Sequence, residues 1–366
     1  MKDIIIAINP GSTSTKFAAY KMRTELFCTT IKHSNEELAK YPRIIDQYKF
    51  RADLIAEGIE RAKISDDSIA AVVGRGGLLY PLKEGGTYEV NDEMVEDLRN
   101  AVQGEHASNL GALIAREIAA KAGCPAYIVD PVIVDEKMDV TRLSGFPGIP
   151  RKSIFHALNQ RAVAKRFASS VGKEYPELNL IVAHLGGGIS VGAHRKGRVV
   201  DVNNALDGDG PFSPERSGTV PAGDLVRLCF SGDFTKEEVL KMIKGNGGVV
   251  GYLGTNDMMA VEHRYLEGEE FPVLVMDSMA YQVASQICSL FAAYEGEHVD
   301  AVLLTGGLAR CKPLVDKITW YLGSIRTEIQ VYPGEDEMGA LRDGAMFVLL
   351  GKEPVKTYKR PEGVGK

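Results

Sequence analysis

The chain has 366 residues, 45% of them hydrophobic, which is more than one ordinary core accommodates and predicts two domains with a cleft between them. A net charge of -6 argues against a nucleic acid or an anionic membrane surface as the main partner. Because the N-terminus enters a strand without a basic leader and no apolar run approaches ~18 residues, we expect a cytoplasmic protein with no membrane span.

The chain opens with a strand and turn that fit a phosphate-binding hairpin. Ile4–Ile8 is an unbroken apolar run that predicts a buried strand, and Asn9-Pro10-Gly11 ends it. The next four residues, Ser12–Thr15, carry hydroxyls, and Lys16 adds a point charge for phosphoryl oxygens. This lysine precedes a second strand, whereas a Walker lysine precedes a helix. A polar hairpin tip without a ligand is the alternative.

The rest of the first half alternates predicted helices and strands. Helices are expected over residues 35–63, 91–102 and 107–121, and short buried strands over residues 69–73 and 127–129. The first of these strands runs into Gly74-Arg75-Gly76-Gly77, where an arginine among glycines is well placed to bind an anion. A solvated arginine in a glycine turn is the alternative. His106 lies at the entry of the last helix, and Asp130 ends the second strand.

A domain boundary is expected at residues 142–150, which hold two prolines and two glycines. A helix is predicted over residues 153–170, with His156 in its first turn. Residues 201–221 have a loop-like composition and contain Arg216. A loop of this length inside a compact domain is usually functional.

Four further features of the sequence have structural interpretations. Residues 272–294 predict a long apolar helix, and Thr235 with Glu238 has the spacing of a capping box. The tail after Gly351 is expected to be loose. The five cysteines are widely spaced without a CxxC pair, so we expect buried thiols.

The apolar strand that runs into a polar or glycine-rich turn recurs in the second half. The sequence LIVAHLGGGIS, residues 180–190, repeats the pattern, and Ser190 matches Ser14 at the same offset that aligns the two strands. A third junction occurs at residues 301–307, AVLLTGG. Three such junctions in two halves predict a duplicated α/β domain in which each copy offers a loop to one nucleotide.

The charged residues near these junctions suit transfer of a phosphoryl group to a carboxylate. A carboxylate acceptor is ionised at neutral pH and needs no catalytic base, but cations must neutralise the charge where two anions meet. Arg75 and Arg216 lie in glycine-rich loops, and His156 and His184 lie near the second-half junction. A purely structural role for each histidine is the alternative.

Five motifs, in order along residues 4–345, resemble those of the acetate and butyrate kinase family. NPGSTSTK resembles the family's opening signature, and Phe155-His156 its Phe-His pair. AHLGGGIS is similar to its phosphate loop, ERSG to its Arg-Ser-Gly segment, and LTGGLAR to its adenosine-side glycines.

Three departures favour the butyrate branch of the family over the acetate branch. Arg75 stands where the acetate enzymes have a histidine, so the carboxylate-binding arginine is displaced. FHALNQ replaces Phe-His-Gly-Thr-Ser-His, and HLGGG replaces His-Leu-Gly-Asn-Gly.

The resemblance implies the α/β fold of the sugar kinase, Hsp70 and actin superfamily, which is ribonuclease H-like. Two βββαβαβα domains would hold the nucleotide in the cleft between them. The last helix, residues 338–350, would return to the first domain. The implied domains are 1–148 plus 338–366 and 149–337, the second binding the nucleotide.

The resemblance also implies a role for each site residue. His156 and Arg216 would stabilise the in-line transition state, and Asp130 would orient Arg216 or the metal. Arg75 would bind the acid, with His106 nearby. The phosphate and nucleotide ligands would be Asn9, Ser12, Ser14, Lys16, His184, Gly186, Gly187, Gly188, Gly306, Gly307 and Arg310. Magnesium would contact Asn9 and either Asp336 or Glu337.

The implied activity is reversible, direct phosphoryl transfer from MgATP to butyrate, giving ADP and butyryl phosphate. Acetate, propionate or a branched acid such as isobutyrate are alternative substrates, and a homodimer or larger homo-oligomer is expected. An actin- or Hsp70-like ATPase that acts as an interaction module is the alternative function. An NAD-dependent dehydrogenase fits less well, because the glycines after Leu185 enter a strand.

Overall fold

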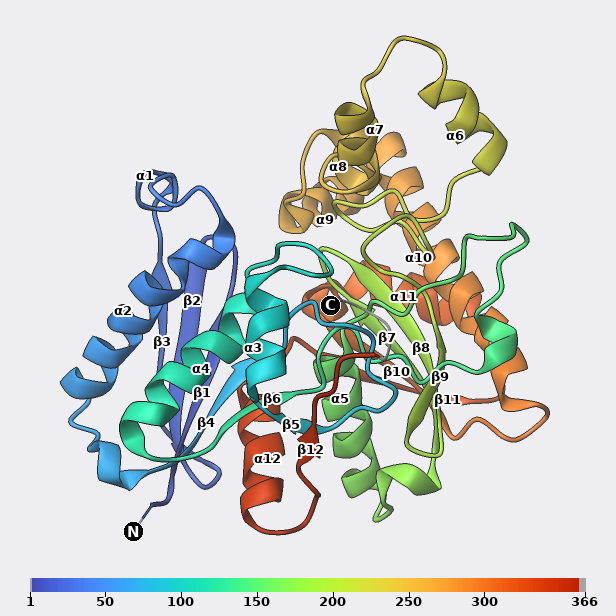
Figure 1. Cartoon of the computed structure of the whole chain (residues 1–366). Helices are drawn as coiled ribbons and strands as arrows, with labels where there is room; N and C mark the ends of the chain where they lie inside the picture. The colour runs from blue at the N-terminus through green and yellow to red at the C-terminus, as the bar shows by residue number, and fades with distance from the viewer. Residues whose placement is uncertain (1, 362–366) are drawn as a thin grey trace. The chain divides into compact units, whose positions relative to one another are not determined.

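The computed structural model describes residues 2–361 and divides the chain into two compact units (Figure 1). The first unit contains the residues up to Val134 and those from Asp336 onward, and the second is Asp135–Glu335. Residues 135–148 group with the second unit because Met138 packs on its core and donates its backbone N–H to the Val200 carbonyl. The sequence-derived domain boundaries, 1–148 plus 338–366 and 149–337, stay a prediction.

The first unit is built on a seven-stranded sheet in the order β12-β5-β6-β4-β1-β2-β3. β1 and β2 form the expected antiparallel hairpin, and β4 lies parallel to β1 on its other side. The strands are β1 (Ile4–Pro10), β2 (Ser14–Lys21), β3 (Thr24–Lys32), β4 (Ile69–Arg75), β5 (Thr87–Glu89), β6 (Ala126–Val129) and β12 (Lys356–Thr357).

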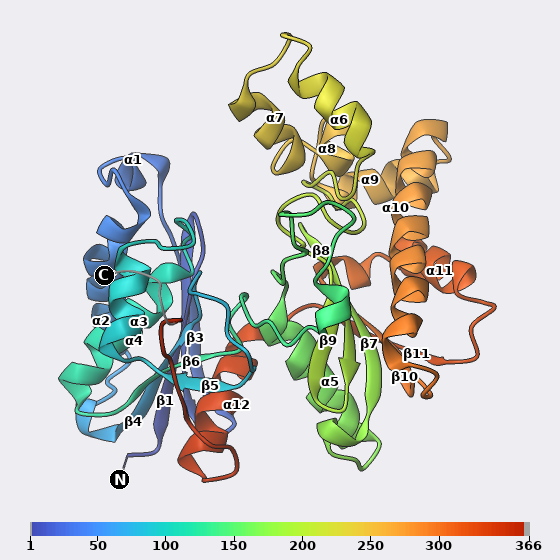
Figure 2. The same ribbon diagram turned by 45° about the vertical axis from the view of Figure 1, so that its right-hand side comes forward.

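Helices cover both faces of this sheet, which explains why β1 is an unbroken apolar run (Figure 2). One face carries α2 (Tyr48–Arg61), α3 (Asp92–Arg99) and α4 (Asn109–Ala122), and the other carries α12 (Glu337–Leu349). A short helix, α1 (Asn35–Leu38), precedes α2. Gly74 and Gly111 let β4 and α4 touch through their backbones, since a Cβ at either position would collide with the other segment.

The tail after Gly351 is ordered by contacts with the first unit, so the prediction of a loose end was wrong as far as residue 361. β12 pairs in parallel with β5. Tyr358 is buried, and its hydroxyl donates to the buried Asp97 carboxylate at 2.6 Å. Arg360 pairs with the same carboxylate. A buried acid with two donors anchors this segment.

The second unit is built on a five-stranded sheet in the order β11-β10-β7-β8-β9. Alternate β7 residues serve two cores: Leu180 and Val182 pack with α5, while Ile181 and Ala183 pack with α10. The strands are β7 (Asn179–Leu185), β8 (Ile189–Arg195), β9 (Arg198–Val202), β10 (Ala301–Gly306) and β11 (Glu328–Pro333). The helices are α5 (Ala157–Ser170), α6 (Ala222–Cys229), α7 (Lys236–Ile243), α8 (Gly248–Leu253), α9 (Met258–Leu266), α10 (Glu270–Ser289) and α11 (Lys312–Tyr321).

The two units repeat one topology, which confirms the expected duplicated βββαβαβα fold. In each, three antiparallel strands are joined by a parallel strand beside the first: β4 pairs with β1, and β10 pairs with β7. A further parallel strand follows, β6 or β11. α12 packs on β1 and β4, as expected for the returning last helix.

Several local predictions differ from the structure. α5 begins at Ala157, and His156 precedes it as the N-cap residue with a non-helical backbone. The long helix α10 stops at Ser289 and continues as a 3-10 turn, Leu290–Tyr294.

The Thr235–Glu238 capping box is confirmed.

The cysteine prediction was wrong for most of the five thiols. Cys311 is buried, Cys124 is half-buried, and the other three are exposed: Cys28, Cys229 and Cys288. Cys28 lies on the edge strand β3, in which no residue is buried. Within residues 2–361, no helix is long and apolar enough to cross a membrane.

Candidate functional site

The turn after β1 is held from inside the protein by Arg51 of α2. This guanidinium is only 1% exposed and donates to the carbonyl oxygens of Gly11 at 2.7 Å, Ser14 at 3.0 Å and Ser12 at 3.1 Å. Burial lowers the pKa of Arg51 to about 10, so it remains a cation at neutral pH. Three carbonyls of the turn face inward, whereas Ser12, Thr13 and Lys16 are exposed.

A second group of polar side chains forms where β1 and β4 end and α12 begins. The parallel register that pairs Ile8 with Gly74 brings Asn9 next to Arg75. The Asn9 Nδ2 donates to Glu337 Oε2 at 2.5 Å. Arg75 Nη1 lies 3.3 Å from Asn9 Oδ1 and 3.2 Å from Glu337 Oε2. We call Asn9, Arg75 and Glu337 the strand-end cluster.

Asp336 and Glu337 have different partners although they are adjacent. Asp336 is the N-cap of α12, and its Oδ1 accepts the Gly339 N–H at 2.9 Å. Glu337 is the first residue of the helix and faces Asn9 and Arg75. Of the two candidate magnesium ligands, the structure brings only Glu337 into the strand-end cluster.

Two further predicted residues of the first unit have local partners. Asp130 is buried, and its Oδ1 accepts the Gly86 N–H at 2.7 Å. His106 is exposed, and its Nδ1 lies 2.7 Å from Ser108 Oγ just before α4.

The two predicted histidines of the second unit stack on each other. The ring centroids of His156 and His184 are 3.7 Å apart, with the planes inclined by 9°. His184 is 1% exposed, and its Nδ1 lies 2.9 Å from Asn159 Oδ1. His184 Nε2 is 3.3 Å from Glu335 Oε1. His156 is half-buried, with Nδ1 2.9 Å from Ser190 Oγ.

Arg216 lies against the glycine loop Gly186–Gly188, which connects β7 and β8. A Cβ at residue 188 would collide with the Arg216 guanidinium, so a side chain there would displace the arginine from this position. Arg216 also donates to the Ala205 carbonyl. Burial lowers the pKa of Arg216, and the nearby Glu215 opposes that shift. The structure therefore brings Arg216 into contact with the Gly186–Gly188 loop.

The third glycine junction adjoins the end of β7. Gly306 has φ +93°, and a Cβ there would collide with the Leu185 backbone. Arg310, after Gly307, lies against Gly334, where an added Cβ would come within 2.5 Å of the guanidinium. Gly306 is the last residue of β10, which pairs with β7. The other two predicted residues, Gly307 and Arg310, come directly after this strand in the chain.

Sequence reasoning missed three residues that hold the predicted ones in place. Arg51 anchors the opening turn, while Gln160 and Ser190 contact each other beside His156. Ser190 carried a signal, since it matched Ser14 in the internal repeat. Arg51 carried none, because it is one charge among several on an ordinary helix.

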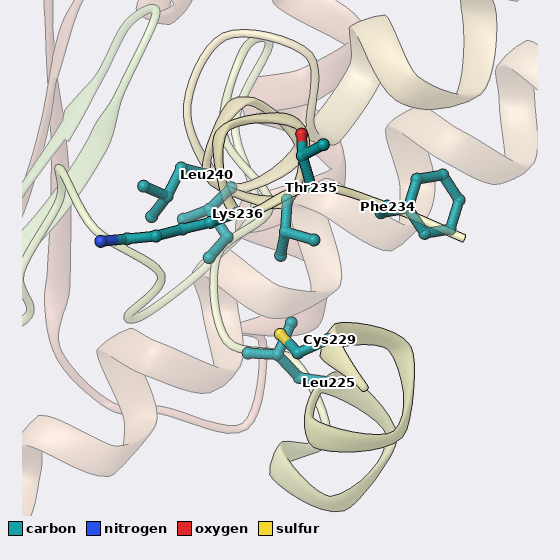
Figure 3. A pocket seen from close by; sticks show the side chains of 8 residues that line it. Leu225, Cys229, Phe234, Thr235, Lys236 and Leu240 are labelled. Carbon is teal, nitrogen blue, oxygen red and sulfur yellow. The ribbon is translucent and has the colours of Figure 1, made fainter. Parts of the chain in front are cut away.

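An apolar pocket of about 240 Å³ lies elsewhere in the second unit, between α6 and α7 (Figure 3). Leu225, Cys229 and Leu240 line it. None of the predicted site residues lies in it. Within residues 2–361, no group of three or more histidines, cysteines and acids is arranged to hold a metal ion.

The sequence matches the model of the acetokinase family over residues 147–319. Among curated relatives, butyrate kinase 2 of Clostridium acetobutylicum is 53% identical over 359 residues, which cover 98% of this chain and 100% of the relative.

Solved structures share the fold at much lower identity. The acetate kinase of Porphyromonas gingivalis superposes with a TM-score of 0.75 and 20% identity, covering 95% of this chain and 100% of that one. A propionate kinase of Francisella tularensis superposes with a TM-score of 0.74 and 18% identity, covering 93% of this chain and 98% of that one.

Proposed function

We propose that butyrate is the preferred substrate of this chain, which belongs to the acetokinase family. The chain is a short-chain carboxylate kinase, a phosphotransferase with a carboxyl group as acceptor. The phosphoryl donor is a nucleotide, for which we propose ATP. Butyrate is proposed because the 53% identical relative, matched along its whole length, is named a butyrate kinase.

The reaction proposed is a single in-line displacement. A butyrate oxygen attacks the γ-phosphorus and forms the new O–P bond, while the bond to the β,γ-bridging oxygen breaks and its electron pair leaves with ADP. No base is required, because the acid is ionised at neutral pH. The protein must instead neutralise negative charge and hold the reactants in line.

The observation that carries the proposal is the geometry of Arg75 in the strand-end cluster. Its side chain is 24% exposed. Among the described residues, its side chain contacts Asn9 and both Glu337 carboxylate oxygens through Nη1 alone, which leaves Nε and Nη2 able to make a two-pronged contact with a carboxylate. We assign Arg75 to the acid, with His106 nearby.

The other roles are proposed by motif. In the first unit, Asn9, Ser12, Ser14 and Lys16 bind phosphate. In the second, His156 and Arg216 stabilise the transition state. The remaining nucleotide ligands are His184, Gly186–Gly188, Gly306, Gly307 and Arg310. Asp130 keeps its proposed role in orienting Arg216 or the metal. A homodimer or larger oligomer and a cytoplasmic location stay predictions.

Magnesium is the proposed metal, and it would screen the phosphate charges. Asn9 and Glu337 offer the amide and carboxylate oxygens that this ion prefers. Glu337→Gln is expected to raise the magnesium concentration for half-maximal activity by roughly tenfold or more.

Asp336→Asn is the matched control, because asparagine also caps helices and Asp336 faces Gly339. Its magnesium dependence is expected to stay close to that of the wild type. Equal shifts for the two variants, measured by magnesium titration at saturating ATP, would contradict the assignment to Glu337.

The substrate is tested with a panel of straight and branched acids from acetate to pentanoate, including isobutyrate. Acyl phosphate is trapped as a hydroxamate. Butyrate is expected to give the highest kcat/KM, and one methylene changes it by about 10- to 200-fold. A preference for acetate would overturn the butyrate proposal, and no product with any acid would overturn the kinase activity.

A further inference from the structure

A line of hydrogen-bonded side chains runs through the second unit from Tyr175 to His156. Tyr175 Oη lies 2.7 Å from His194 Nδ1, and His194 Nε2 lies 2.9 Å from Gln160 Oε1. Gln160 Nε2 donates to Ser190 Oγ at 2.8 Å, and Ser190 Oγ lies 2.9 Å from His156 Nδ1. We call these five side chains the polar relay. All but His156 are buried.

The orientation of the Gln160 amide follows from its contact with the β8 backbone. One end of the amide lies 3.0 Å from the Ser190 carbonyl oxygen, which can only accept a hydrogen bond. That end must therefore be the NH₂ group, which donates to both Ser190 O and Ser190 Oγ. The Gln160 carbonyl oxygen then faces His194 and needs a donor.

His194 supplies that donor through Nε2–H. This histidine is fully buried, and burial lowers its pKa to about 3, with Arg161 acting in the same direction. It is therefore neutral at pH 7, with one ring N–H. Because Nε2 carries the proton that it donates to Gln160, His194 Nδ1 is an acceptor, and the Tyr175 hydroxyl donates a hydrogen bond to it.

The direction of the Ser190 hydroxyl follows in turn. Its oxygen accepts from Gln160 Nε2 at 2.8 Å and from the His156 backbone N–H at 3.4 Å. Two accepted bonds occupy its two lone pairs, so the remaining group is its own O–H. That proton points to His156 Nδ1, which must then be an acceptor.

We propose that the polar relay fixes His156 as the Nε2–H tautomer, so that it meets the transferring phosphoryl group as a neutral hydrogen-bond donor. Ser190 and Gln160 are positioning residues, and stacking on His184 holds the ring plane. If His156 Nδ1 carried a proton, that proton would face the Ser190 hydroxyl proton, and the hydrogen bond between the two side chains would be lost. The catalytic part of this proposal rests on the proposed function, whereas the tautomer does not.

The tautomer is read directly from the nitrogen and proton correlation pattern of ¹⁵N-histidine-labelled protein at pH 7.5, without substrates. The His156 signals are identified by their loss in His156→Gln. The wild type is expected to show only the Nε2–H pattern for His156. An Nδ1–H or doubly protonated His156 would overturn the proposal without the need for a relay variant.

Ser190→Ala removes the donor to Nδ1 and is expected to give a mixed tautomer signal. We expect kcat to fall about tenfold, the equivalent of one hydrogen bond, with the KM for ATP within twofold. Ser170→Ala is the control, since that exposed hydroxyl at the end of α5 bonds only the Phe167 carbonyl among the described residues.

A pure Nε2–H signal in folded Ser190→Ala, or an unchanged kcat, would overturn the proposal. Failure of the proposed function has a different signature. The wild type would then form no acyl phosphate with any acid, while the tautomer pattern would still be observed.

Discussion

Replacing Arg216 by alanine is expected to lower kcat by about 10³-fold while the KM for ATP changes by less than about threefold. The reason is the place of the guanidinium against the glycine loop. It donates to the Ala205 carbonyl, and the absence of a side chain at Gly188 leaves room for it. In the role proposed for it, Arg216 would stabilise charge that is largest in the transition state, so its loss is expected to affect kcat more than ground-state binding.

Arg227→Ala is the matched control, because this arginine belongs to the same unit but is exposed and pairs only with Asp224 among the described residues. Its kcat should match that of the wild type. Thermal unfolding of both variants separates catalysis from folding. Similar losses in kcat and in ATP affinity for Arg216→Ala would contradict the transition-state role.

Replacing Arg51 by methionine is expected to destabilise the first unit more than any surface change. Methionine fills much of the space but leaves the carbonyls of Gly11, Ser12 and Ser14 without their buried donor. The cost is on the order of 3 kcal/mol, which lowers the unfolding temperature by roughly 6 to 12 °C. The KM for ATP should also rise, because the turn that carries Ser12 and Lys16 loses its support.

Arg61→Met, on the exposed end of the same helix, provides the comparison. Arg61 pairs with Glu57 at the surface, and its loss should shift the unfolding temperature by no more than about 2 °C. Calorimetry with and without ATP measures both variants. Equal unfolding temperatures for Arg51→Met and Arg61→Met would contradict the anchoring role.

The sequence predicted the features that depend on residues close together in the chain. Both hairpins were identified from the apolar runs of β1 and β7 and the glycines after them. A buried strand requires apolar residues, and a tight turn favours glycine. The capping box at Thr235 was readable for the same reason. The overall fold came from the resemblance and the internal repeat.

Contacts between distant residues were not predictable in this way. The buried bond from Tyr358 to Asp97 joins residues 261 positions apart, so the ordered tail left no local signal. The choice between Asp336 and Glu337 depends on where α12 begins, which no spacing rule fixes to one residue. Arg51 is recognisable only once the turn carbonyls are seen around it.

The most direct test of the account is to measure ADP and butyryl hydroxamate together in one reaction with ATP, magnesium and butyrate. Direct transfer to the acid predicts one hydroxamate for each ADP, with ADP formation dependent on butyrate. ADP released at the same rate with and without butyrate, and without hydroxamate, would contradict a carboxylate kinase and indicate a nucleotide-hydrolysing protein instead.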